Sequence, residues 1–307
     1  MKIIEKWRLW FLVSGLVFAV GLAVMLGRAY HQEPVLNYGV DFTGGTQFIL
    51  KVDSLLPSDS GAGVDHGEFL GGLRASLDAF PLEKAQLRVT EHGELMIRTI
   101  QLDMETRQSL LAYLSGELGE MELLEVSVVG PSIGEELREQ SLWIIGLVSI
   151  GLMIYISLRF EWVYGAAALA AVIHDAALVL GISALMNIEV NTAFVAAILT
   201  ILGYSINDTI VIFDRIRENL KDVDRETEGL ASINSSIQQT LMRSLHTSIT
   251  TLTVIAALLF FGGSTIQSFT QVLFIGVIVG TYSSICIASP VLVKLGVLES
   301  PVQEEGA

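Results

Sequence analysis

The sequence predicts a membrane protein, with an all-α bundle of six transmembrane helices and a small α+β domain outside the membrane. The 307 residues are 51% hydrophobic, and the mean hydropathy is +0.58. The apolar residues are clustered into runs, and a helix needs about 20 such residues to cross the hydrocarbon of a bilayer. Six runs of suitable length occupy residues 9–27, 141–158, 162–186, 191–213, 246–262 and 269–293.

The first run is expected to remain in the protein as a span. It contains 19 uncharged residues, and the Arg28-Ala29-Tyr30-His31 sequence that follows is a poor signal-peptide cleavage site.

Lys and Arg residues near the ends of the spans predict the orientation, because cytoplasmic loops carry an excess of them. Two, Arg28 and Arg138, flank one set of ends. Nine flank the other set: Lys2, Lys6, Arg8, Arg159, Arg215, Arg217, Lys221, Arg243 and Lys294. We therefore expect both termini in the cytoplasm. The predicted division is residues 1–28 (N-terminus and first span), 29–140 (exterior domain), 141–295 (five spans with a cytoplasmic loop at 214–243) and 296–307 (cytoplasmic tail).

The exterior stretch is acidic. Residues 29–140 contain 19 Asp and Glu against 7 Lys and Arg, a net charge of −12 out of −15 for the chain. This balance argues against a nucleic-acid partner. It is weakly compatible with basic or unfolded polypeptide partners, but the ordinary solubility of an exposed domain is the preferred explanation. The single cysteine, Cys286, excludes an intrachain disulfide, and the five scattered histidines do not indicate a metal site.

Alternating patterns in the exterior stretch predict a ferredoxin-like βαββαβ sandwich. Strands are expected at 46–52, 85–91, 94–99 and 121–129, and helices at 65–80 and 103–117. Asp103 is the expected cap of the second helix, His92-Gly93 the turn between the middle strands, and Gly130-Pro131 the end of the last strand. Residues 57–63 read as a loop.

A short motif, DFTGG at residues 41–45, precedes the sandwich. Gly44 and Gly45 permit a sharp turn, so Asp41, Gly44 and Gly45 are interpreted as a structural turn where the exterior domain begins. No Lys and no following helix accompany the glycines, which disfavours a phosphate-binding loop. Without a nucleotide fingerprint or a nucleophile–base pair, we expect no enzyme and no cofactor, and an ion gradient as the energy source.

Charged side chains inside the predicted membrane spans are the main functional signal. Asp208 is the only charge in residues 191–213, and His174 and Asp175 lie near the middle of residues 162–186. Placing a charged side chain such as a carboxylate at the centre of a bilayer costs about 2.5–3.5 kcal/mol on insertion scales. Arg243 enters from the same side, and Asp208 lies about 9 Å from the cytoplasmic end of its span. We therefore expect these two side chains to meet.

The expected proton pathway consists of Asp208, Arg243, Asp175 and His174. A supporting polar and small face is expected from residues that share a helix side with them: Tyr204, Asn207, Gly203 and Thr247. A carboxyl that alternates between a cationic and an apolar setting would take up and release protons. The alternative is a static polar clasp that only holds helices together.

At these residues the chain resembles the SecF family of protein-export membrane subunits. Residues 203–218 read GYSINDTIVIFDRIRE, residues 172–175 read VIHD, and residues 240–245 read TLMRSL, followed by Thr247-Ser248. With DFTGG and the six-span layout, the resemblance covers essentially the whole chain. The acidic tail from Glu299 onward departs from many relatives, which are basic there.

The resemblance implies a bacterial cytoplasmic (inner) membrane protein, one half of a unit similar to the proton-driven RND superfamily. It implies partnership with SecD, the SecYEG channel, a YidC-type insertase and exported unfolded polypeptide, besides the lipid bilayer. It also places the family's proton pathway on Asp208 and Arg243, with Asp175 as a further candidate. Two alternatives stay open: an RND-type efflux transporter subunit, which the chain length disfavours, and a non-conducting scaffold of the translocon.

Overall fold

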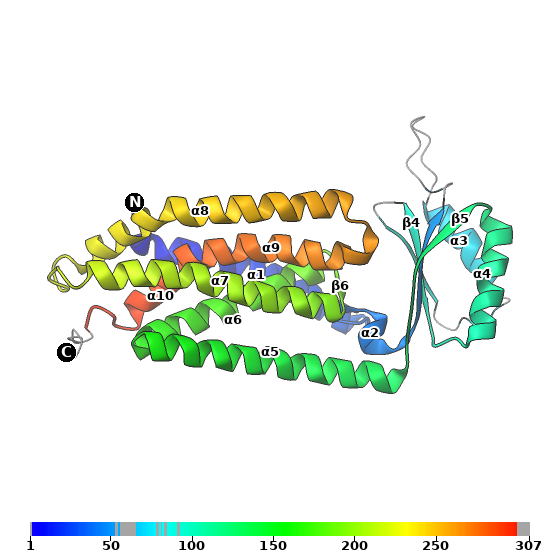
Figure 1. Ribbon diagram of the computed structural model, residues 1–307, viewed down its shortest axis with the longest axis horizontal. Helices are drawn as coiled ribbons and strands as arrows, with labels where there is room; N and C mark the ends of the chain where they lie inside the picture. Colours follow the sequence, from blue (N-terminus) through cyan, green and yellow to red (C-terminus); the bar gives the residue numbers. More distant parts are fainter. Residues whose placement is uncertain are drawn as a thin grey trace, which may run out of the picture.

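The computed structural model describes residues 2–52, 55, 66–77, 80, 82, 85–90 and 93–299. The predicted loop at 57–63, His92 of the predicted turn and residues 300–307 of the predicted tail lie outside these residues. Figure 1 shows an elongated molecule, with a bundle of long helices at one end and a small sheet covered by helices at the other.

Six helices of the described chain are long and apolar enough to cross a membrane, as predicted. The first five are α1 (Trp7–Tyr30), α5 (Pro131–Arg159), α6 (Trp162–Leu185), α7 (Thr192–Asn219) and α8 (Gly229–Phe261). The sixth span consists of α9 (Gln267–Ser283), a π-helical turn η4 (Ser284–Ala288) and α10 (Ser289–Lys294). Short 3-10 turns, η1 (Ile4–Lys6) and η3 (Ser264–Ile266), precede α1 and α9.

Two helices are longer than the apolar pattern alone predicted. α5 begins at Pro131, although its apolar run begins at residue 141, and α8 begins at Gly229 rather than residue 246. In both cases a polar stretch of the same helix precedes the apolar segment. The start of a helix is set by its backbone conformation and hydrogen bonds, and not by the point at which hydropathy rises.

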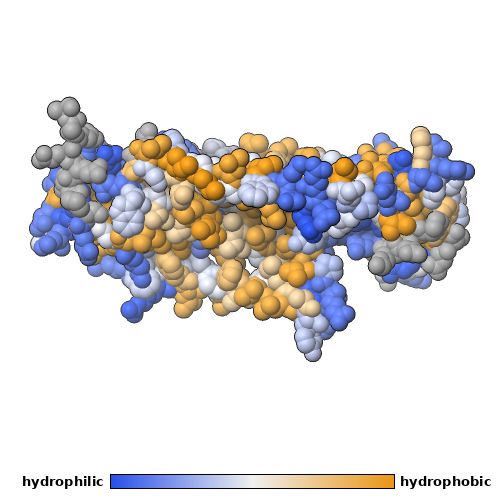
Figure 2. Space-filling model, turned by 90° about the horizontal axis from the view of Figure 1, so that it is seen from below, coloured by the Kyte–Doolittle hydropathy of each residue, from blue (hydrophilic) through white to orange (hydrophobic). Residues whose placement is uncertain are grey.

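The bundle has a buried centre and an apolar outer surface. In the most apolar part of each span, 72% of the residues are buried in the last span and 50% in α6 and α7, against 11% in α1 and α5. Figure 2 shows hydrophobic side chains along the middle of the bundle, with hydrophilic residues towards its ends. A belt of this kind suits contact with lipid.

The domain that was predicted to lie outside the membrane has the expected βαββαβ order. Its elements are β2 (Gly45–Val52), α3 (His66–Leu77), β3 (Gln86–Val89), β4 (Glu94–Thr99), α4 (Met104–Leu118) and β5 (Met121–Val129). The antiparallel sheet has the order β3-β4-β2-β5. Phe48 and Ile97 from the strands pack with Leu110 and Leu114 of α4. Asp103 caps α4 as predicted, because its carboxylate accepts a 2.8 Å bond from Thr106 N.

The sequence did not predict how the sandwich joins the bundle. β1 (Asn37–Tyr38) pairs in parallel with β6 (Glu189–Val190), the connection between α6 and α7. A short helix, α2 (Val40–Thr43), then packs against α5. The sandwich itself starts at Gly45, after a turn in which Gly44 and Gly45 have φ of 69° and 129°.

Candidate functional site in the membrane bundle

Asp208 lies on the inner face of α7 and is only 7% exposed. Its neighbours on the buried side of the helix include Ser205, Thr209 and Ile212. Ser244 Oγ of α8 donates to Asp208 Oδ1 over 2.8 Å, and Ser284 Oγ of the π-helical turn donates to Oδ2 over 3.4 Å. The carboxyl is therefore held by neutral hydroxyls from two neighbouring elements.

Arg243 does not make the expected direct pair with Asp208. It lies exposed on α8, next to the buried Ser244, and the part of the chain that the structure describes contains no ion pair between the two side chains. The physical reason is helix geometry: successive residues are rotated by about 100° around the axis. The residue that points at Asp208 is thus Ser244, and Arg243 points towards the outside of the bundle.

A second polar cluster surrounds Asp175 on α6, which is completely buried. Ser205 Oγ of α7 donates to Asp175 Oδ2 over 2.5 Å, and His174 Nδ1 lies 2.9 Å from Oδ1. The other ring nitrogen of His174 contacts Ser14 Oγ of α1 at 2.8 Å. Tyr282 lies 3.2 Å from the same hydroxyl. Side chains of four spans thus form one hydrogen-bonded chain.

The two clusters meet on α7. Ser205 of the Asp175 cluster and Asp208 are three residues apart, which places them one turn apart on a similar side of the helix. Helix α9 packs closely against this part of α7, because a Cβ added at Gly280 would lie 3.0 Å from Ser205 Cβ. Both carboxyls therefore lie in one polar region of the bundle centre.

The π-helical turn at Ser284–Ala288 provides part of the Asp208 site. Pro290 follows it and has no backbone N–H, so a regular α-helix cannot continue unchanged through this position. Widened turns of this kind commonly lie at functional sites. Here the turn carries Ser284, which contacts Asp208.

The predicted supporting residues fall on different sides of their helices. Tyr204 donates to Ser248 Oγ over 3.2 Å, and Ser248 lies 2.6 Å from Thr281 Oγ1. Thr247 is exposed and bonds carbonyl oxygens of its own helix. Gly203 and Asn207 are exposed on the outer face of α7, so neither supports the buried carboxyl within this chain.

Sequence reasoning found His174 beside Asp175 but missed the hydroxyl residues around the two carboxyls. Ser244 and Ser248 repeat at the i, i+4 spacing of one helix face, which was an available signal. The last span also contains a hydroxyl-rich stretch, TYSSICIAS at residues 281–289, from which Thr281, Tyr282 and Ser284 enter the site. Ser14 and Ser205 gave no separate signal, because isolated serines are common in transmembrane helices.

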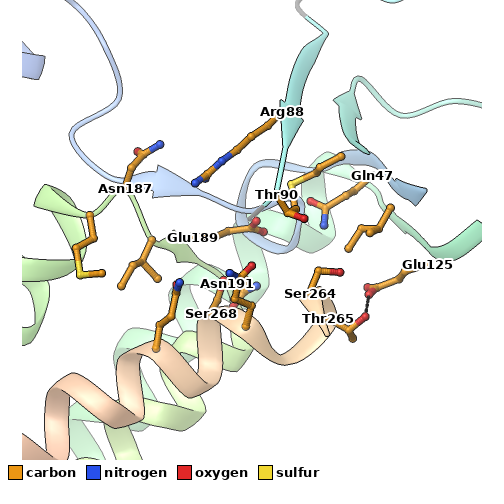
Figure 3. A pocket seen from close by; sticks show the side chains of 16 residues that line it. Gln47, Arg88, Thr90, Glu125, Asn187, Glu189, Asn191, Ser264, Thr265 and Ser268 are labelled. Carbon is orange, nitrogen blue, oxygen red and sulfur yellow. Dashed lines mark hydrogen bonds between the residues drawn. The ribbon is translucent and has the colours of Figure 1, made fainter. Parts of the chain in front are cut away.

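The predicted turn residues lie at the end of the bundle that adjoins the sandwich. Asp41 Oδ2 accepts hydrogen bonds from the backbone N and the hydroxyl of Thr192, the first residue of α7. A Cβ at Gly45 would lie 2.4 Å from the carbonyl oxygen of Thr99, which explains the glycine there. Beside this junction, a cleft of about 110 Å³ separates the sheet from the bundle (Figure 3).

Within the described chain, no group of three His, Cys, Asp or Glu side chains is arranged to hold a metal ion. Residues 111–297 match the family described as "Protein export membrane protein SecD/SecF, C-terminal", and residues 34–54 match the "SecD/SecF GG Motif". The chain belongs to the SecD/SecF family. Its members are protein-transport proteins of the membrane and not enzymes.

Individual members of the SecD/SecF family cover nearly all of the chain. The protein translocase subunit SecF of Sebaldella termitidis is 35% identical over 306 residues, which are 99% of this chain and 95% of that protein. The crystal structure of Thermus thermophilus SecDF, a translocon-associated membrane protein, superposes with a TM-score of 0.81 at 36% identity. A structure of SecDF in a "Super-membrane-facing form" gives 0.64 at 34% identity. Both cover 96% of this chain, which spans 38% of the SecDF chains.

Proposed function

We propose that this SecF-family chain works with a separate SecD chain and uses the proton gradient to drive or complete polypeptide export. The chain corresponds to only 38% of a SecDF relative, which supports a partner that supplies the remainder. SecYEG and a YidC-type insertase are further proposed partners. The proposed location is the bacterial cytoplasmic membrane, with both termini in the cytoplasm and residues 29–140 outside.

The observation that carries this proposal is the environment of Asp208. It is buried in a membrane-spanning helix, and the partners that the structure gives it are the uncharged hydroxyls of Ser244 and Ser284. An ionised carboxylate there is a buried charge without a countercharge in contact, and such a charge is costly. Binding a proton removes this cost, so proton occupancy changes the free energy of the helix arrangement.

A rearrangement of α8 would connect proton binding to a change of shape. A rotation of about 100° exchanges one residue for the next at a given position on a helix face. Arg243 would then approach Asp208 in place of Ser244 and stabilise the ionised carboxylate. The neutral form would favour the arrangement described above. Protons crossing the membrane supply about 2.3 kcal/mol per charge per 100 mV, which this exchange would use.

Asp175 and His174 are proposed to extend the pathway. Asp175 is linked to α7 through Ser205, and His174 is linked to α1 through Ser14. Hydroxyl and imidazole groups both donate and accept hydrogen bonds, so this chain of side chains is chemically able to pass a proton. Arg243 and the exposed residues Gly203, Asn207 and Thr247 are proposed to face the SecD partner.

The test is export into vesicles with and without an imposed proton gradient, using the complex with SecD. Asp208→Asn preserves size and hydrogen bonding but cannot titrate, so we expect gradient-stimulated export to fall to the level without a gradient. Asp222→Asn, an exposed carboxyl in the α7–α8 connection, is the control and should retain stimulation. Normal stimulation in assembled Asp208→Asn complex would favour the scaffold alternative.

A further inference from the structure

The exterior sandwich contacts the bundle through an ion pair that is shielded from solvent. Arg98 on β4 reaches the α6–α7 connection, where Nη2 lies 2.5 Å from Glu189 Oε2. Only 12% and 10% of the two side chains are exposed. The other guanidinium nitrogens also have partners, since Nη1 donates to Asn37 Oδ1 and Tyr38 O and Nε donates to Gln47 Oε1.

Backbone contacts reinforce this junction and lead directly to α7. Tyr38 of β1 is paired with Val190 of β6. Gly39 packs so closely that a Cβ there would lie 2.3 Å from Glu189 Oε1. Asp41 then accepts a 3.0 Å bond from the backbone N of Thr192, at the start of α7. This junction therefore ends on the helix that carries Asp208.

The contact with the α8–α9 connection is of a different kind. Thr265 donates to Glu125 Oε2 over 2.9 Å in a solvent-exposed bond, in which Thr265 is exposed and Glu125 is half-buried. Figure 3 shows this bond at the edge of the cleft, opposite Glu189 and Asn191. The cleft separates the sheet face from this end of the bundle. An exposed hydrogen bond is easily replaced by water, whereas removing one partner of a buried ion pair leaves an uncompensated charge.

We propose that Arg98 and Glu189 fix the sandwich to the outer end of α7 throughout the transport cycle, and that the sandwich slides at the Thr265–Glu125 contact. A displacement of α7 then moves the exterior domain. Arg98 is a positioning residue, since it acts on exported polypeptide only through the placement of the sandwich. This inference rests on the proposed function in one step, in which proton binding at Asp208 moves α7.

Distances between spin labels test the fixed and the sliding contact without an export assay. Both label pairs share Ser115→Cys, an exposed position on α4, in a Cys286→Ala background of the complex with SecD. The second label is at Met186, 52% exposed at the end of α6, or at Phe261, 89% exposed at the end of α8. We expect one narrow distance for 115–186 and a broader distribution for 115–261.

Arg98→Gln should broaden the 115–186 distribution, and Arg107→Gln, a change of a half-buried residue that bonds Asp103 O at the start of α4, should leave it narrow. Arg98→Lys keeps a positive charge that can donate to Glu189 and should broaden the distribution less than Arg98→Gln, which a general loss of folding would not explain. A narrow 115–186 distance in Arg98→Gln, or two equally narrow distances in the parent protein, would overturn the proposal.

Reversible cross-links then test the consequence for transport. A disulfide between Tyr38→Cys and Val190→Cys joins the two paired strands and should leave gradient-stimulated export intact. A disulfide between Glu125→Cys and Thr265→Cys blocks the sliding contact and should bring that export down to its level without a gradient until a reductant is added. The opposite pattern would refute the proposal. If the parent protein shows no gradient stimulation, the proposed function is wrong. The spin-label distances still show whether Arg98 and Glu189 fix the sandwich to the end of α7.

Discussion

Ser244 donates a 2.8 Å hydrogen bond from α8 to Oδ1 of Asp208 on α7. A hydroxyl both donates and accepts, so it can serve an ionised carboxylate as a donor and a protonated carboxyl as an acceptor. A guanidinium cannot do this, because it only donates. Ser244 therefore suits the neutral carboxyl of this arrangement, whereas a guanidinium would suit only the ionised form.

Replacing Ser244 by Ala removes this contact and should weaken gradient-stimulated export. Leaving a buried group with one partner fewer costs about 1–3 kcal/mol, so we expect a decrease of roughly five- to a hundredfold. The measurement is the export rate into vesicles as a function of the imposed gradient, with assembly with SecD checked by co-purification. Thr253→Ala is the matched control on α8, since Thr253 is exposed and bonds Ile249 O of its own helix. Equal effects of the two changes would contradict a special role for Ser244.

The sequence was sufficient to find Asp208 but not its partners. A lone carboxyl in an apolar run is conspicuous, because its cost in a bilayer is high. The residue of α8 that faces Asp208 is harder to identify, because α8 has two polar stripes. One contains Arg243 and Thr247, and the other contains Ser244 and Ser248. Small and hydroxyl residues occur on several faces of transmembrane helices. Only the packing of α7 against α8 decides between stripes that differ by one residue.

A similar limit applies to the exterior domain. Alternating residues and Gly-containing turns predicted the sandwich, because each strand and helix has a local pattern. The junction has none: β1 and β6 are two residues long and pair Asn37 with Glu189 across 152 positions of the chain. Arg98 likewise lies in the predicted strand 94–99 with no local pattern that marks it. Its role depends on the α6–α7 connection, which lies beneath the sheet in space.

The predicted orientation can be checked with single cysteines in a Cys286→Ala background. Ser115→Cys lies in the sandwich and Asp222→Cys in the α7–α8 connection, and both positions are exposed. Because positive residues flank the α7–α8 connection, we expect this connection in the cytoplasm. An impermeant thiol reagent should then label Ser115→Cys in intact cells, and Asp222→Cys only after the membrane is opened. The reverse labelling would place the sandwich inside.

The junction should also give Arg98→Gln a characteristic pH dependence. Burial raises the pKa of Glu189 above its ordinary value of 4.5, the Arg98 guanidinium opposes this rise, and the Asp41 carboxylate adds to it. A carboxyl with a raised pKa stabilises the folded state below pH 4.5, and this contribution is lost as the pH rises through the raised pKa. Removing Arg98 raises the pKa further and widens this window.

We therefore expect the thermal midpoint of Arg98→Gln to fall more steeply than that of the parent protein as the pH rises from 4.5. Arg98→Gln with Glu189→Gln removes the titrating group and should abolish the additional slope. The measurement is thermal unfolding of the detergent-solubilised complex over a pH series. Parallel curves for all three proteins would show that Glu189 does not titrate against Arg98.

The crossing of α1 and α6 offers a test of packing within the membrane. Gly21 on α1 faces Gly181 on α6, and a Cβ at Gly21 would lie 2.6 Å from Gly181 Cα. Gly21→Ala must therefore push the two helices apart, and overpacking of this kind costs about 1–3 kcal/mol. The site lies about 10 Å along α1 from Ser14, so the separation should also weaken the Ser14–His174 contact.

Gly15→Ala on the same helix provides the control, because a Cβ there has no neighbour within 4 Å among the described residues. We expect Gly21→Ala to lower the thermal midpoint of the detergent-solubilised complex by several degrees and Gly15→Ala to leave it unchanged or slightly raised, since Ala favours helix over Gly. Gly181→Ala should be milder than Gly21→Ala, because its Cβ would lie 3.5 Å from Gly21 Cα, an ordinary contact distance. If Gly21→Ala and Gly15→Ala gave the same midpoint, α1 would not be packed against α6 at this crossing, and the Ser14 contact with His174 would lose its support.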